Sequence, residues 1–88
     1  MKTRSTPLAP LARRTLIAMF ELTSAGQPVH AGSLAHALGA KASAVGEALC
    51  ELDAHGLVWL SRCALTMPGL ALASRLARRA TLLRRHAA

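Results

Sequence analysis

Two short helical patterns, separated by one glycine, constrain the fold of this chain more than any other feature. Over residues 34–58 the apolar residues recur three and four positions apart, which is the spacing of one face of an α-helix. Gly39 interrupts the pattern after the first run, and Gly56 ends the second. Glycine readily adopts the left-handed conformation that ends a helix. The sequence therefore predicts a short helix over residues 31–38, a tight turn and a longer helix over residues 42–55.

Another helix is expected before this pair. Pro10 suits the first position of a helix, where its missing N–H is not needed. Apolar residues follow at helical spacing to about Ser24, and Gly26 and Pro28 then end the pattern. The sequence thus predicts an amphipathic helix over residues 10–24.

After residue 56 the period changes from helix to strand. The runs 57–60 and 63–66 are expected to pair as antiparallel strands across residues 61–62, although that turn has neither glycine nor asparagine. Thr66 can N-cap a last helix. One apolar stripe of that helix is expected to hold Leu72, Leu76, Ala80 and Leu83.

These patterns predict a single domain that is mostly α, with a small β-hairpin and a C-terminal helix. Hydrophobic residues make up 52% of the 88 residues and aromatic residues only 2%, so Leu, Ala, Val and Met must form the core. A core of such small side chains in so short a chain is thin, and dimerisation would stabilise it. No apolar run approaches the roughly 20 residues that cross a bilayer. We expect a cytoplasmic protein that does not enter membranes.

Residues of the two central helices, and of the segment that follows the hairpin, resemble a motif of known proteins. They are Leu34-Ala35-His36-Ala37-Leu38-Gly39, Ser43-Ala44-Val45, Leu49, Leu52, Gly56-Leu57-Val58 and Leu65-Thr66-Met67-Pro68-Gly69-Leu70-Ala71-Leu72-Ala73. The pattern resembles the winged helix-turn-helix repressors of bacteria, in particular the MarR-like and ArsR-like groups. The resemblance implies a winged helix-turn-helix over residues 10–75, with a flexible basic arm over residues 1–9 and a basic helix end over residues 76–88.

The resemblance also implies binding of double-stranded DNA by a homodimer. It puts residues 40–44 at the major groove, where Lys41 and Ser43 are the polar groups. Arg62 would lie at the tip of the wing, beside the minor groove, although this wing is short. The expected DNA-binding residues are Lys41, Ala42, Ser43, Ala44 and Arg62, together with Arg13 and Arg14 of the basic flank.

The distribution of charge supports a polyanionic partner. The net charge is +7, and all four acids lie within residues 21–53, where Lys41 is the single Lys or Arg. Both flanks are basic and carry no acid. Nucleic acid is the first expectation and an anionic membrane surface the second.

The helix predicted to enter the groove departs from the family in one respect. Gly46 and Glu47 stand where a basic or amide residue is usual, and Glu47 and Glu51 are expected to share an outward face. Carboxylates repel phosphates. Two accounts remain open: either DNA contacts are confined to the start of this helix, with affinity from the basic flanks, or the helix binds a protein.

The basic last helix has three interpretations. It can be a dimerisation helix with a solvated basic face, or a helix that contacts phosphates outside the groove. It can also be an amphipathic helix that lies on a membrane, but its apolar side has no Trp or Phe to anchor it there. The membrane interpretation is the weakest of the three.

Other reactive side chains suggest no further chemistry. The four histidines with Cys50 and Cys63 have no ligand spacing, so no metal or cofactor is expected. The thiols are expected to be free, and a Cys50–Cys63 redox pair is a lesser alternative. Trp59 is expected to cover the edge of the core. No catalytic pair or phosphate loop is present, so the chain is not expected to be an enzyme.

The sequence thus predicts a sequence-specific transcriptional regulator, a repressor by resemblance, that acts as a homodimer on two half-sites. The main alternative is a winged-helix adaptor that binds a protein partner and does not read DNA. A third hypothesis is non-specific nucleoid binding through the two basic flanks.

Overall fold

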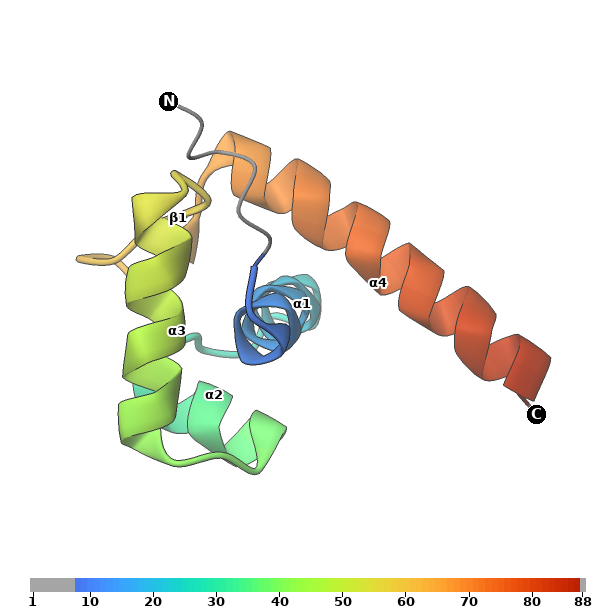
Figure 1. Ribbon diagram of the computed structural model, residues 1–88, viewed down its shortest axis with the longest axis horizontal. Coiled ribbons are helices and arrows are strands. Elements are labelled where there is room, and N and C mark those ends of the chain that lie inside the picture. The colour runs from blue at the N-terminus through green and yellow to red at the C-terminus, as the bar shows by residue number, and fades with distance from the viewer. Residues whose placement is uncertain (1–7, 88) are drawn as a thin grey trace.

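The computed structural model describes the backbone of residues 8–87 and the side chains of residues 8–81. This part of the chain forms a single domain of four helices and one two-stranded antiparallel hairpin, as expected (Figure 1). The elements are α1 (Pro10–Ser24), α2 (Ala31–Leu38), α3 (Ala42–Ala54), β1 (Val58–Trp59), β2 (Ala64–Leu65) and α4 (Met67–Ala87). In Figure 1, α1 lies in the middle and is seen nearly end on, with α2, α3 and α4 around it.

Local signals set the ends of the helices. Pro10 is the first residue of α1, as predicted. His30 caps α2. Its side-chain Nδ1 accepts the backbone N–H of Ser33 at 3.1 Å, and the backbone N–H of His30 donates to Ser33 Oγ at 3.0 Å. These reciprocal bonds satisfy N–H groups that have no partner within the helix. Gly39 ends α2 at a φ of 63°, which turns the chain sharply toward α3.

The hairpin has the expected register, but its strands are shorter than the expected four residues. Val58 pairs with Leu65 and Trp59 with Ala64, which is the alignment of a turn centred on residues 61–62. The prediction of four-residue strands is wrong, because residues 60–63 all belong to the turn. Cys63 takes a left-handed φ of 51° there, where glycine or asparagine would fit without strain.

The core is built from aliphatic side chains of every helix and the hairpin. Leu16 and Met19 of α1, Leu34 of α2 and Leu52 of α3 are fully buried. From α4 the buried residues are Gly69, Ala73 and Ala77. Of the predicted stripe, Leu72 and Leu76 pack against the core, and with Ala80 they are half-buried, because α4 presents its small residues where it packs most closely. The side chain of Leu83 lies outside the described residues.

The first turn of α4 packs directly on the backbone that precedes β1. A Cβ added to Gly69 would come 1.8 Å from the Leu57 carbonyl oxygen, so this approach needs glycine. Thr66 caps the helix, since its Oγ1 accepts the Gly69 N–H at 3.1 Å and donates to the Gly56 carbonyl oxygen at 2.8 Å. The predicted N-cap is confirmed, and it ties α4 to the end of α3.

The start of the described chain is held against the body. Leu8 packs on the core, and the Ala9 N–H donates to Glu51 Oε2 at 2.9 Å. The end of the arm predicted for residues 1–9 is therefore ordered, and its other seven residues lie outside the described part. Among residues 8–87 no helix has the length and apolar character needed to span a membrane.

Candidate nucleic-acid interface

The N-terminal end of α3 is open to solvent. Lys41 is its N-cap residue and makes no side-chain cap, and the first turn has no acidic residue. Lys41, Ala42 and Ser43 are exposed. The first N–H groups of a helix have no partner within the helix, and they carry the positive end of its dipole. This end of α3 therefore combines a lysine, a hydroxyl and unshared N–H donors, which is a favourable setting for an anion.

Ala44, the fourth residue predicted at the groove, differs from its neighbours. It is half-buried and lines a small hollow of about 140 Å³ between α3 and the start of α1. The surface that α3 can offer to a ligand at this end is therefore limited to Lys41, Ala42 and Ser43.

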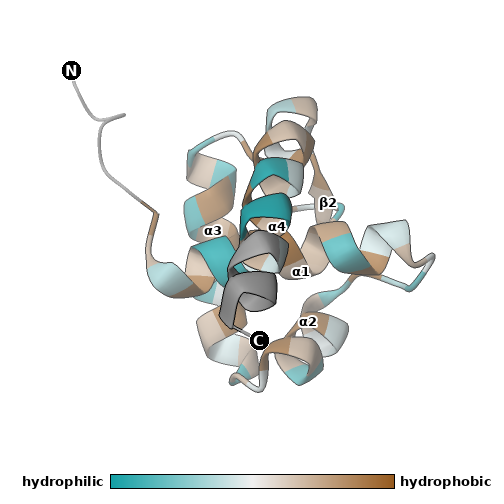
Figure 2. Cartoon of the chain, turned by 90° about the vertical axis from the view of Figure 1, so that its right-hand side faces the viewer, coloured by the Kyte–Doolittle hydropathy of each residue, from teal (hydrophilic) through white to brown (hydrophobic). Residues whose placement is uncertain are grey.

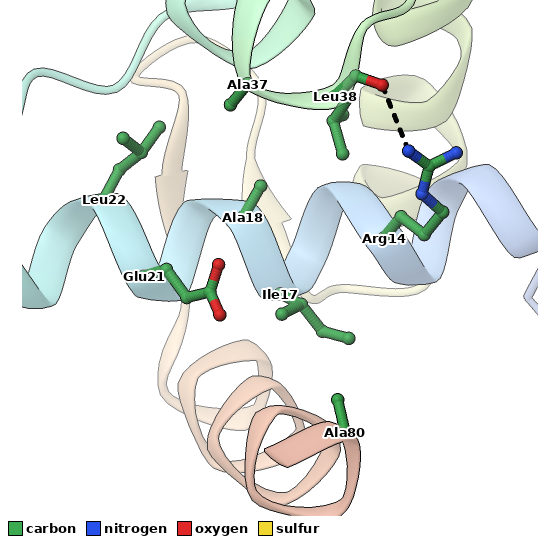
Figure 3. Close-up of a pocket in the computed structure, with 8 residues that line it drawn as sticks. All are labelled: Arg14, Ile17, Ala18, Glu21, Leu22, Ala37, Leu38 and Ala80. Atoms are coloured by element: carbon green, nitrogen blue, oxygen red, sulfur yellow. Dashed lines mark hydrogen bonds between the residues drawn. The ribbon is translucent and has the colours of Figure 1, made fainter. Parts of the chain in front are cut away.

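Arg13 and Arg14 are adjacent in the sequence and differ in their contacts with α2. Arg14 Nη2 donates to the carbonyl oxygen of Leu38 at 3.0 Å, and Leu38 is the last residue of α2 (Figure 3). This bond places a guanidinium beside the turn that leads into α3. Both arginines also line a hollow against α4, together with Arg79. Only Arg14 is thus tied to the turn between α2 and α3.

Beyond its first turn, the exposed face of α3 is acidic. Glu47, Cys50 and Asp53 are exposed on it, and α3 contains no Lys or Arg. Asp53 Oδ1 accepts the Leu60 N–H at 3.4 Å, a long bond that leaves much of its charge uncompensated. Phosphates would be repelled along this face.

Glu51 lies one turn from Glu47 on the same face, as predicted, and lines the same hollow, but it is less exposed than the prediction has it. It is half-buried, and its carboxylate receives the Ala9 N–H. Ala9 is the N-cap residue of α1, so the carboxylate also lies at the positive end of that helix. Glu51 therefore joins α3 to α1, and only Glu47 and Asp53 remain as acids of the exposed face.

The tip of the hairpin presents a cation on an aromatic ring. The Arg62 guanidinium carbon lies 5.3 Å from the centre of the Trp59 ring. Trp59 is 49% exposed and does not cover the core edge, so that prediction is wrong. Side chains alternate along a strand, and Val58 takes the inward position. The Trp59 ring holds Arg62 at the outer surface of the hairpin.

The thiols differ in their environments. Cys50 is exposed on α3, Cys63 is half-buried in the hairpin turn, and both are free. Burial raises the pKa of the Cys63 thiol. Among the side chains of residues 8–81, no three from His, Cys, Asp or Glu come together as a set of metal ligands.

Sequence reasoning missed an apolar groove along α1, on the side of that helix that faces α4. Ile17 points from α1 toward Ala80 of α4, and the space beside them is open (Figure 3). One signal in the sequence could have found it. Ile17 is a large apolar residue that lies outside the buried stripe of α1, and it faces α4, which is rich in arginine.

Comparison with known proteins identifies no relative: no protein-family model matches the chain, and neither a curated protein nor a solved structure is detectably similar to it. Support for a function therefore comes from the geometry of the described residues.

Proposed function

We propose that this chain is a DNA-binding transcriptional regulator of the winged helix-turn-helix type, which contacts duplex DNA with the N-terminal end of α3. The observation that carries the proposal is the open start of α3, where Lys41 and Ser43 flank uncapped N–H groups. The order of elements also supports it, since a short helix, a glycine turn, a longer helix and a hairpin follow one another. In a helix-turn-helix, the start of the second helix meets the base edges.

The acidic face limits how α3 is placed on DNA. Because Glu47 and Asp53 would repel phosphates, α3 enters the major groove end first and does not lie along it. Lys41 then contacts a phosphate, while Ser43 contacts a base edge or a second phosphate. Arg14, bonded to the end of α2, adds a cation beside the same turn.

Arg62 lies beyond the C-terminal end of α3, and the 13 residues of α3 span about 20 Å. When α3 enters the groove end first, this length holds the hairpin away from that groove. The minor-groove contact of Arg62 that the resemblance implies stays a prediction that this orientation does not support, and the proposal rests on the start of α3.

A homodimer is part of the proposal. A monomer reads one half-site, whereas a dimer reads two that lie about one helical turn apart. In Figure 1 the C-terminal end of α4 projects away from α2 and α3, which leaves that end open to a second copy. Sedimentation equilibrium gives the mass directly, and a monomer at all concentrations contradicts this part of the proposal. Repression is the expected direction, and the regulation of a reporter gene tests it.

Lys41→Ala combined with Ser43→Ala tests the DNA contact. Duplexes are first selected from a random pool, and affinity is then measured by fluorescence anisotropy over a range of salt. We expect the double variant to lose about 1–3 kcal/mol for a good base contact. The loss of one phosphate contact should also lower the salt slope by about 0.9.

The matched control for this test is Ser74→Ala combined with Arg75→Ala. This variant also removes one hydroxyl and one cation, from α4, and should change affinity much less. If the wild-type protein binds selected and unrelated duplexes equally at every salt concentration, the proposal is wrong.

An adaptor that binds protein is the second candidate, and the acidic exposed face of α3 is the observation that favours it. The same double variant separates the two functions. An adaptor that docks through Glu47 and Asp53 keeps its partner when Lys41 and Ser43 are replaced and loses it when the two acids are replaced by amides.

A further inference from the structure

Two hollows lie side by side along α1. One, of about 340 Å³, opens between α1, α2 and α4, and the other, of about 290 Å³, opens between α1 and α4. Arg14, Ile17 and Ala80 line both hollows, which makes them one continuous depression, called here the α1–α4 groove. Figure 3 shows its first part, with Ile17 of α1 and Ala80 of α4 facing each other, and with Ala18 of α1 pointing toward Ala37 and Leu38 of α2.

The groove has the length of a short helix. Its lining on α1 runs from Pro10 to Leu22, a rise of about 18 Å. A helix of about 12 residues, or three turns, has the same length. Peptide helices that bind in such grooves place apolar anchors at i, i+3, i+4 and i+7.

The floor of the groove is apolar. Pro10, Ile17, Leu76 and Ala80 form it in the part between α1 and α4. Ile17, Leu76 and Ala80 are half-buried, so each keeps apolar surface in contact with water. Covering that surface with other apolar side chains is favourable.

The rim of the groove is cationic. Arg13, Arg14 and Arg79 line the part between α1 and α4, and no acid does. Glu21 is the one acid that lines the groove, in the part that reaches α2. The other three acids of the chain are on α3. Figure 2 shows strongly hydrophilic bands on the side of α4 that faces the viewer.

We propose that the α1–α4 groove binds an acidic amphipathic helix of a partner protein. Apolar side chains of that helix cover Ile17, Leu76 and Ala80, and its carboxylates meet Arg13 and Arg79. Electrostatic complementarity of this kind selects the partner and speeds the encounter. A regulator with this groove would recruit a second protein to the place that it occupies on DNA.

Two other occupants fit the groove less well. A DNA strand would satisfy the arginines and leave the apolar floor without a partner. A second copy of this chain, packed groove to groove, would place Arg13 and Arg79 against the same arginines of its partner, and like charges in contact are unfavourable. Neither Lys41 nor Ser43 lines the groove, although Arg14 borders both surfaces. The tests below therefore use Arg79 and Ile17, which have no part in the proposed DNA contact.

The probe is a designed peptide of about 15 residues, with leucines at i, i+4, i+7 and i+11 and glutamates on both sides of them. It is capped at both ends and carries a neutral fluorophore. One control peptide has a lysine for each glutamate, and a second has the acidic composition with a central proline that prevents the helix. We expect the acidic helix to bind to the full chain at least about tenfold more tightly than either control.

Charge reversal at two arginines of α4 tests the location. Arg79 lines the groove, whereas Arg75, one turn earlier on the same helix, is exposed and does not. R79E and R75E change the net charge equally. We expect R79E to weaken peptide binding about tenfold and R75E less than about threefold. Ile17→Ala should also weaken it, because the floor loses apolar surface. Circular dichroism checks that every variant is folded.

Several results would overturn the inference. Equal losses in R79E and R75E would mean that net charge alone attracts the peptide. Equal binding of the proline peptide would mean that no helix is recognised. A protein dimer that excludes the peptide, and dissociates in R79E, would assign the groove to a second copy. Displacement of the peptide by duplex DNA, with the same loss of affinity for DNA as for the peptide in R79E, would assign the groove to DNA.

The double variant Lys41→Ala with Ser43→Ala is the control for the proposed DNA contact, and it should leave peptide binding unchanged.

Discussion

The two sides of this molecule differ in the charge that they expose. On the α3 side, Glu47 and Asp53 are exposed, and Lys41 stands alone at the helix start. On the α4 side, Arg75, Arg78 and Arg79 are exposed on one helix. The helix with the geometry of a DNA reader is thus not the helix that holds the positive charge. The comparison teaches that the proposed DNA contact has to work without a broad basic face around it, so a few groups at the start of α3 must supply it.

The two sides meet where the start of α4 packs against the end of α3. Gly69 in the first turn of α4 lies against the Leu57 backbone, which directly follows α3 and its terminal glycine. The largest effect is therefore expected where this contact is broken. In Gly69→Ala the new Cβ would lie 1.8 Å from a carbonyl oxygen that has little room to shift. We expect a loss of about 3 kcal/mol of unfolding free energy.

Gly46→Ala is the matched control, because it is the same substitution in the middle of α3 with nothing within 4 Å of the added Cβ. It should stabilise the fold by about 0.5–1 kcal/mol, since alanine is the better helix former. Urea unfolding measures both variants. If Gly69→Ala is as stable as the wild type, α4 is not fixed to the α3 side in the way described.

The second prediction reverses a charge on the acidic face of α3. Glu47→Lys replaces an exposed carboxylate with a cation, and we expect DNA affinity to rise about tenfold at low salt. The salt slope should become steeper by about 0.9 if the lysine contacts a phosphate. Anisotropy titrations at several salt concentrations measure both quantities.

Glu21→Lys changes the net charge by the same amount on α1, where the side chain is also exposed. It should raise affinity less than Glu47→Lys, because α1 is not the helix proposed to meet DNA. Equal gains in the two variants would mean that DNA responds to net charge only. In that case the contrast between the two sides of the molecule has no consequence for DNA binding.

The helices could be predicted closely from the sequence because their signals are local. Pro10 begins α1, Gly39 ends α2 and Thr66 caps α4, and each acts on residues within a turn of itself. The hairpin register was predicted as well, from the change of period after Gly56. The strand lengths were not, because Cys63 accepts a left-handed conformation that its residue type does not favour.

The surroundings of the candidate site depend on contacts between distant residues, and these could not be predicted. Glu51 has the helical spacing of an exposed residue, yet it receives the Ala9 N–H from a position 42 residues earlier. The sequence predicts that Trp59 covers the edge of the core, yet its side chain is 49% exposed and its ring lies against the Arg62 guanidinium. The α1–α4 groove depends on where two helices diverge, which no local pattern records.

The smallest expected effect concerns the two thiols. Cys50 lies on α3, and Cys63 lies in the hairpin turn. Cys50 is exposed, whereas Cys63 is half-buried and burial raises its pKa. The thiolate is the form that reacts, so iodoacetamide at neutral pH should modify Cys50 faster than Cys63. Raising the pH should increase the rate at Cys63, because its thiolate fraction grows.

Bound duplex DNA sharpens this prediction. Cys50 is exposed and lies about two and a half turns along α3 from Lys41. If α3 enters the groove end first, Cys50 stays outside it, and DNA should change the rate of its modification only slightly. Mass spectrometry of the modified peptides gives both rates. Full protection of Cys50 would mean that α3 lies along the groove despite Glu47 and Asp53, and the acidic face would then have to meet base edges.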